Sequence, residues 1–155
     1  MPQLAKGGKF IFGWSRITES LSIQLPSMAV DEYAITSEGK VYLFSGSNST
    51  GGFCVTKKSL LLTSQIRNIL DDTPALCKYL LPEGELVRFK GRQYCWVTIS
   101  KDGILHVSSE LLHGLGLSIN DRLLAIRSSN IAFTMGVTGR LIAMANAYEG
   151  YIEEF

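Results

Sequence analysis

The sequence predicts a mainly β protein with short helices, an α+β fold made of two tandem copies of one β-β-α-β-β unit. Residues 10–59 align with residues 92–141 at a constant offset of 82 and without a gap, and this alignment superposes the chain's two tryptophans, Trp14 and Trp96. Apolar residues also alternate along short segments of both copies, as they do in strands buried on one face. One copy alone is too small to bury a sufficient core, so we expect the two copies to share one core, anchored by the two tryptophans.

The first copy opens with an apolar and aromatic run that is typical of a strand. Its second strand alternates and places Ile23 and Leu25 on one face. A helix of one to two turns is predicted to follow, with Ser27 as its N-cap. A hairpin around the glycines of the NSTGG segment completes the copy. The predicted strands of this copy are residues 9–17, 22–26, 40–47 and 53–58.

The second copy repeats this order. Gly103 follows Lys-Asp in a tight turn and is expected to take a positive φ angle. His106 lies between two apolar residues, so we expect it to face away from the core. A short helix is predicted from an N-cap at Ser108 or Ser109 to the glycines at 114–116. The predicted strands of this copy are residues 92–100, 104–108, 122–129 and 131–137.

The segment between the copies has apolar residues at helical spacing and a break at Pro74. It predicts one helix, a kink and a second, shorter helix, which pack on the sheets because they are too apolar to form a tether. A short helix is also expected around residues 141–147. The predicted organisation is a first unit at 8–59, a helical linker at 60–87, a second unit at 88–142 and a C-terminal tail at 143–155.

Composition narrows the classes of function. The net charge is +1, from 15 basic and 14 acidic residues, so the basic excess typical of a strong nucleic-acid binder is missing. Cys54, Cys77 and Cys95 are odd in number and lack the spacing of a disulfide framework or a zinc site. No catalytic or cofactor motif occurs, and the start lacks the apolar stretch of a signal peptide. We therefore expect a cytoplasmic protein that is not an enzyme and has no cofactor, metal or membrane segment.

Residues 97–126, VTISKDGILHVSSELLHGLGLSINDRLLAI, carry a recognisable pattern. A strand, a turn with glycine, an apolar strand, a short helix ending in Leu-Gly-Leu, a polar turn with Asp and a further strand follow one another. This segment resembles the AbrB/MazE/SpoVT swapped-hairpin family, and residues 15–44 resemble it more faintly through the repeat. The matching positions are Gly103, Val107, Glu110, Leu111, Leu115, Gly116, Leu117, Asp121 and Leu124.

The resemblance implies two units whose strands interleave into one barrel-like body, which family members usually build as a homodimer. Here one chain supplies both halves, so we expect a monomeric pseudo-dimer that can pair further. The family's usual roles are transcription regulation and antitoxin activity through double-stranded DNA. However, Ile104 and Leu112 in the second copy, and Ser22 and Asp31 in the first, stand where basic residues are frequent in the family.

Two hypotheses follow. The first is an AbrB-like DNA-binding transcription regulator, whose candidate contacts lie before or within the first hairpin of each copy: Lys9, Arg16, Lys90, Arg92 and Lys101, with Lys6 beside them. The alternative is a non-enzymatic binding module that keeps the fold but recognises a protein partner or a small ligand. Its candidate residues lie in the SGSNSTGG and RSSNIAFTMG segments: Ser47, Asn48, Thr50, Ser129, Asn130 and Thr134.

Overall fold

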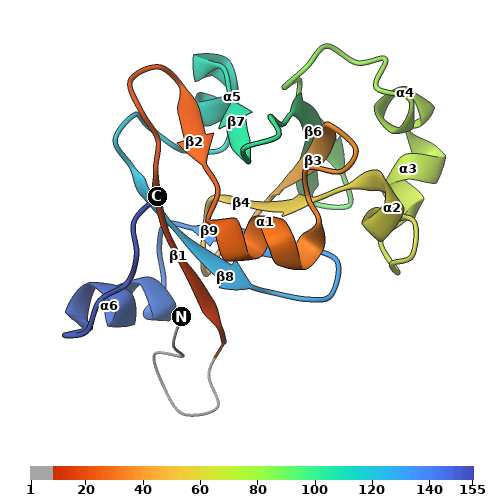
Figure 1. Cartoon of the computed structure of the whole chain (residues 1–155). Coiled ribbons are helices and arrows are strands. Elements are labelled where there is room, and N and C mark those ends of the chain that lie inside the picture. Colours follow the sequence, from red (N-terminus) through yellow and green to blue (C-terminus); the bar gives the residue numbers. More distant parts are fainter. Residues whose placement is uncertain (1–8) are drawn as a thin grey trace.

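The computed structural model describes residues 9–155. A seven-stranded antiparallel sheet has the order β1-β8-β9-β4-β3-β6-β5, and β2 and β7 form a separate two-stranded ribbon (Figure 1). The strands are β1 (Ile11–Arg16), β2 (Ser22–Gln24), β3 (Lys40–Ser45), β4 (Phe53–Thr56), β5 (Val87–Phe89), β6 (Arg92–Thr98), β7 (Ile104–His106), β8 (Arg122–Arg127) and β9 (Phe133–Gly136). The helices are α1 (Ser27–Tyr33), α2 (Lys58–Leu61), α3 (Asn68–Asp72), α4 (Pro74–Cys77), α5 (Ser109–Gly114) and α6 (Arg140–Ala147).

This architecture confirms the predicted mainly β fold with short helices. In the described part of the chain the sheet is open, with β1 and β5 at its two ends, so the closed, barrel-like body that we expected does not form. The predicted strands of both copies are all present, although several are shorter than the apolar segments that predicted them. The helix expected around residues 141–147 is α6.

Four strand pairings join the two copies to each other. The first strand of each copy lies against the third strand of the other, as β1 with β8 and β6 with β3. The second strands form the β2–β7 ribbon, and the last strands form the β4–β9 pair. The registers of the first two pairings are equivalent. Trp14 lies opposite Leu124, and Trp96 lies opposite Tyr42. Trp96 follows Trp14 by 82 residues, and Leu124 follows Tyr42 by the same number.

The gapless offset of 82 fails in the last strands. Tyr42 pairs with Thr56, whereas its counterpart Leu124 pairs with Gly136, so β4 and β9 correspond at an offset of 80. The reason is loop length: residues 46–52 join β3 to β4, and the shorter segment 128–132 joins β8 to β9. The structural counterpart of Cys54 is therefore Thr134.

One face of the sheet carries a core to which both copies contribute. Phe12, Val41 and Val55 of the first copy pack in one cluster with Val97 and Leu123 of the second copy. Helices α1 and α5 and the β2–β7 ribbon cover this face, and they bury the alternating apolar residues of both second strands (Figure 1). As predicted, His106 on this ribbon is exposed.

The opposite face carries two smaller clusters, one around each tryptophan. Trp14 packs with Ile142 of α6, whereas Trp96 packs beside the cluster formed by Tyr42 and the linker helices. The expectation that both tryptophans anchor the shared core is therefore wrong. Their alternating positions place them on the face that α6 and the linker cover.

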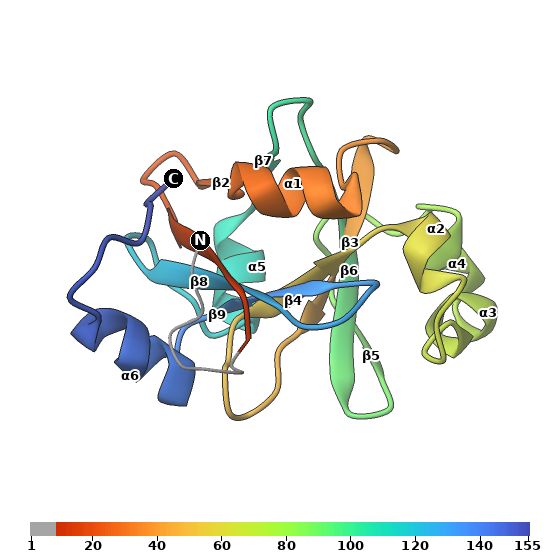
Figure 2. The same ribbon diagram turned by 60° about the horizontal axis from the view of Figure 1, so that its bottom comes forward.

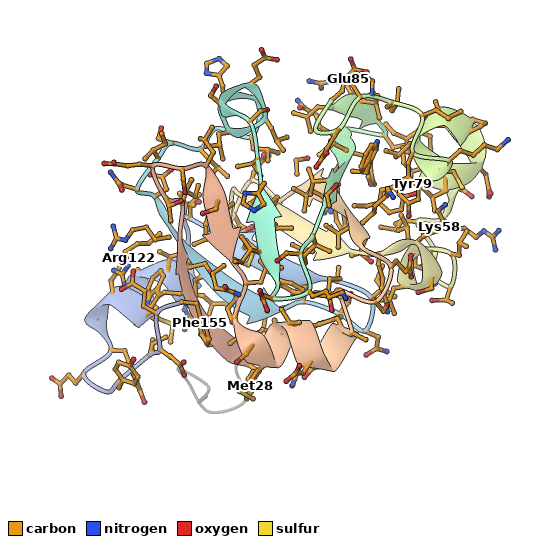
Figure 3. The ribbon with its side chains drawn as sticks, turned by 45° about the horizontal axis from the view of Figure 1, so that its top comes forward. Met28, Lys58, Tyr79, Glu85, Arg122 and Phe155 are labelled. Carbon is orange, nitrogen blue, oxygen red and sulfur yellow. The ribbon has the colours of Figure 1, made fainter. Side chains whose placement is uncertain are left out.

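Each tryptophan ring lies near a cation of the other copy, and the two cations are 82 residues apart. The guanidinium carbon of Arg122 is 4.1 Å from the Trp14 ring centroid, and Lys40 Nζ is 6.0 Å from that of Trp96. Lys40 and Lys58 also lie over Tyr79, and Figure 3 shows Lys58 and Tyr79 together at the linker. The contact between Lys40 and Tyr79 attaches the linker to the sheet, whereas the contacts of the two tryptophans join neighbouring strands of the sheet.

The helix ends differ in part from expectation. Ser108 is the N-cap of α5, as predicted, and its side chain accepts a hydrogen bond from the backbone N–H of Leu111 at 3.0 Å. Ser27 is not an N-cap: α1 begins at Ser27 itself, because Pro26 occupies the cap position. The first predicted linker helix is broken between α2 and α3, where the hydroxyls of Thr63 and Ser64 bond to carbonyls three residues earlier and compete with the helical pattern.

The segments after each copy return to an outer strand of the sheet. Strand β5 pairs with β6, and the C-terminal residues pair with β1, where Trp14 N–H donates to Glu153 O and Phe155 N–H donates to Trp14 O. This approach requires Gly13, because a Cβ atom there would lie 2.7 Å from Glu153 O. Figure 3 shows Phe155 beside β1.

Candidate ligand-binding pocket

A cavity of about 570 Å³ opens on the face of the sheet opposite the shared core. Its floor comes from the four central strands, β3, β4, β9 and β8. Leu141 of α6 and residues 64–66 of the linker form its sides, and Figure 2 shows α6 and the α2–α4 segment on opposite flanks of these strands. The cavity therefore lies where the two copies meet.

The floor of the pocket contains one row of side chains that crosses all four strands. Phe44 lies opposite Cys54, Cys54 opposite Thr134, and Thr134 opposite Ile126. Each copy supplies two members of the row, and the central pair is in contact, with Cys54 Sγ 3.4 Å from Thr134 Oγ1. The row offers a ligand two apolar ends and a weakly polar centre.

Burial raises the pKa of the Cys54 thiol above its usual range, and the hydrogen bond with Thr134 offsets this only in part. The thiol is therefore protonated at neutral pH, and it acts as a small, weakly polar surface within the floor. Thr134 also contacts the Ser128 hydroxyl, which connects the floor to the β8–β9 loop.

Hydroxyl groups from both hairpin loops form the rim. In the β3–β4 loop, Ser47 Oγ lies 2.8 Å from Ser49 Oγ and 3.4 Å from Thr50 Oγ1. In the β8–β9 loop, the backbone of Ser129 is anchored because its carbonyl accepts a 2.7 Å hydrogen bond from the Tyr33 hydroxyl. Desolvation by burial, with a smaller contribution from the neighbouring Glu32, raises the pKa of Tyr33 to about 12, so this hydroxyl remains a donor at neutral pH.

Two cationic side chains complete the pocket wall. Lys9 precedes β1 and Arg92 begins β6. The Arg92 guanidinium carbon is 5.4 Å from the centroid of the Phe44 ring in the floor. The lining contains no Asp or Glu, and none of the ion pairs between described residues includes Lys9 or Arg92. The pocket is therefore electropositive.

A second cavity of about 310 Å³ adjoins the first. The two share Gln65, Ile66 and Arg92, and the second adds Lys90 and the aromatic ring of Tyr94. Together they form a groove between the linker and the sheet.

The structure brings together most of the residues predicted for a ligand site. Ser47, Thr50, Ser129 and Thr134 all line the main cavity. Asn48 does not line it, and Asn130 lines a different cavity beside Glu32, Tyr33 and Arg127.

The basic residues proposed for DNA do not form one face. Lys9, Lys90 and Arg92 lie along the groove. Arg16 lies elsewhere and pairs with Glu154 at 3.2 Å, and Lys101 is exposed on the turn between β6 and β7. Lys6 lies outside the described residues.

Sequence reasoning missed several members of the site. Ser49 and Ser128 lie in the same two polar loop segments as the predicted residues, so the polar composition of those segments could have identified them as candidates. Cys54 and Phe44 were interpreted only as strand residues, although period-two alternation places both on the face opposite the core residues Leu43 and Val55. The contribution of Ile66 could not be inferred, because it depends on where the linker packs.

No protein-family model matches the chain, and a search of curated proteins found no match. Among residues 9–155, no helix is long and apolar enough to cross a membrane. Over the same residues, no cluster of three or more His, Cys, Asp or Glu side chains could hold a metal ion.

Proposed function

We propose that this protein is a non-enzymatic binding module that takes a small organic anion in the main pocket. One observation carries the proposal: a cavity with an apolar floor has Lys9 and Arg92 in its wall and no carboxylate in its lining. Its volume of about 570 Å³ lies within the range of about 300–1,000 Å³ that small-molecule sites occupy.

The parts of the site have complementary roles. Phe44 and Ile126 remove apolar surface of the ligand from water, which supplies a favourable but non-directional contribution. The hydroxyls of Ser47 and Thr50 donate hydrogen bonds that orient it. Arg92 provides a charge-assisted contact, and its guanidinium lies within cation–π distance of the Phe44 ring.

The experiment compares two arginine variants that remove the same charge. Isothermal titration calorimetry at low salt would measure octanoate and hexyl phosphate binding to the full chain, Arg92→Ala and Arg88→Ala. Arg88 lies on β5 and does not line either cavity of the groove. We expect about a tenfold loss for Arg92→Ala, the value of one charge-assisted hydrogen bond, and no loss for Arg88→Ala. Equal effects of the two variants, or no binding of either probe, would contradict the proposal.

We propose in addition that the fold is an intramolecular swapped-hairpin pseudo-dimer of the AbrB type. The exchange of first strands between the copies, as β1 with β8 and β6 with β3, supports this assignment. The equivalent registers of the two pairings support it further. Light scattering coupled to size-exclusion chromatography is expected to give a monomer at low concentration, since both halves come from one chain.

DNA binding is the second candidate function, and the strand exchange favours it because the AbrB resemblance implies that role. The first-hairpin turns, residues 18–21 and 100–103, nevertheless carry Lys101 against Glu19 and Asp102, which is not a basic surface. If duplex DNA binds, its affinity must fall as salt rises. Replacing Arg16, Arg92 and Lys101 together with alanine should then weaken binding to all sequences. Absence of binding to any duplex at low salt would exclude this function.

A further inference from the structure

We propose that the pocket is built for a ligand with two anionic groups, one at each end of a largely apolar body. This inference rests on the proposed function, because it specifies the class of anion that the same pocket takes. It comes from the positions of the two cations, Lys9 and Arg92, relative to the row of floor residues between them.

Both cations lie on the pocket side of the sheet. Lys9 lies two residues before Ile11, and Arg92 lies two residues before Tyr94. Ile11 and Tyr94 belong to the clusters on this face. Arg92 shares a face with Tyr94 because the two are two residues apart on β6, and Lys9, which precedes β1, lines the cavity on the same face. Both side chains therefore reach the same cavity, in agreement with its lining.

The two cations lie toward opposite edges of the sheet, on the same face. Four strands, β8, β9, β4 and β3, lie between β1 and β6. At about 4.8 Å per strand, the backbones of Lys9 and Arg92 are roughly 24 Å apart along the sheet. Ile11 and Tyr94 extend the row of floor residues at its two ends, opposite Ile126 and Phe44. Because β1 and β6 run in opposite directions, Lys9 and Arg92, each two residues earlier, lie on opposite sides of this row.

The surface between the cations is mostly apolar. Phe44 lies on the Arg92 side and Ile126 on the Lys9 side, with Cys54 and Thr134 at the centre. A compact inorganic anion would meet only one cation and would leave the apolar floor uncovered. An elongated ligand with an acid at each end would satisfy both cations and cover the floor between them.

Matched ligand pairs test the number of anionic groups. Calorimetry would compare the α,ω-dicarboxylates from hexanedioate to dodecanedioate with the mono-acids of equal chain length. The same comparison would use hexanediol bisphosphate and hexyl phosphate, so that the carboxylate and phosphate sources are distinguished. We expect at least one two-headed probe to bind about tenfold more tightly than its one-headed partner, since it gains a second charge-assisted contact.

Variants then assign the two ends. Lys9→Ala and Arg92→Ala should each reduce affinity for the best two-headed probe to near that of the one-headed probe, while Lys101→Ala, which removes a charge outside the pocket, should not. If one-headed probes bind as tightly as two-headed ones, and Arg92→Ala weakens both, this inference is overturned while the proposed function stands. If no probe of either kind binds, both fail.

Discussion

Gly52→Ala is expected to disrupt the junction between the two copies. Gly52 has a φ angle of 62° and immediately precedes β4, whose Phe53 pairs with Met135 of β9. A Cβ atom at Gly52 would lie 1.9 Å from the Met135 carbonyl oxygen, and that oxygen belongs to the backbone and has no rotamer to change. The two strands would have to separate locally to admit one methyl group.

The expected loss in the free energy of unfolding of Gly52→Ala can be compared with that of a control variant that introduces backbone strain alone. Gly91→Ala places alanine at a similar φ of 82°, where an added Cβ would meet nothing within 4 Å. It should cost only the left-handed strain, about 1–2 kcal/mol. Gly52→Ala carries the same strain and also weakens one or two strand hydrogen bonds and the packing between β4 and β9. We expect a total of about 3–5 kcal/mol, which is large for a single substitution.

Urea unfolding followed by circular dichroism would give the free energy of unfolding of both variants. If the two variants have the same m-value, the difference between them is a difference in stability and not in the compactness of the unfolded state. A difference between the variants of less than about 0.5 kcal/mol, which is the usual effect of a neutral surface substitution, would refute the close approach of β4 and β9 at this position.

The remaining predictions concern Tyr33, the helix caps and the shared core. Tyr33→Phe should lower the free energy of unfolding by about 1–2 kcal/mol at pH 7, because two loop carbonyls lose their donor. The pKa of Tyr33 is raised from 10.0 in the unfolded chain to about 12 in the folded protein. The stability linked to the protonated hydroxyl is therefore fully present below pH 10 and is lost as pH rises toward about 12. Between these two pH values, the free energy of unfolding of Tyr33→Phe should fall less steeply with pH than that of the unaltered protein. Ser108→Ala should cost about 1 kcal/mol in thermal unfolding and Ser27→Ala much less, since only Ser108 caps its helix; equal losses would contradict this assignment. Fragments 1–57 and 88–155 expressed separately should be poorly folded by circular dichroism, and two sharply melting fragments would rule out the shared core.

The local elements were within reach of sequence reasoning because their signals are local. Alternation identified the strands, and the buried Ile23 and exposed His106 follow from it. The Gly103 turn, with a φ of 80°, depends on the backbone freedom of one residue, and the Ser108 cap depends on a hydrogen bond within one turn. The Ser27 cap failed because Ser27 lies inside the first turn of its helix, directly after Pro26.

Local sequence signals predicted only some of the residues of the candidate site. Ser47, Thr50, Ser129 and Thr134 were predicted as ligand-binding candidates from the polar residues of two repeated loop segments, but the sequence did not show that both segments would line one cavity. Arg16 illustrates the opposite error, because its charge is obvious in the sequence while its partner, Glu154, lies near the other end of the chain.

The sequence by itself determined the repeat, the order of strands and helices, and the face of each strand that is apolar, since these depend on neighbouring residues and on the period of two. Tertiary structure alone decided which copy each strand pairs with, how the longer 46–52 loop shifts β4 to an offset of 80, and where α6 and the linker pack. Strand edges present the same backbone donors and acceptors whatever their sequence, so pairing is settled by long-range packing of the whole core. The pocket lies where these non-local choices meet, at the contact of Cys54 with Thr134.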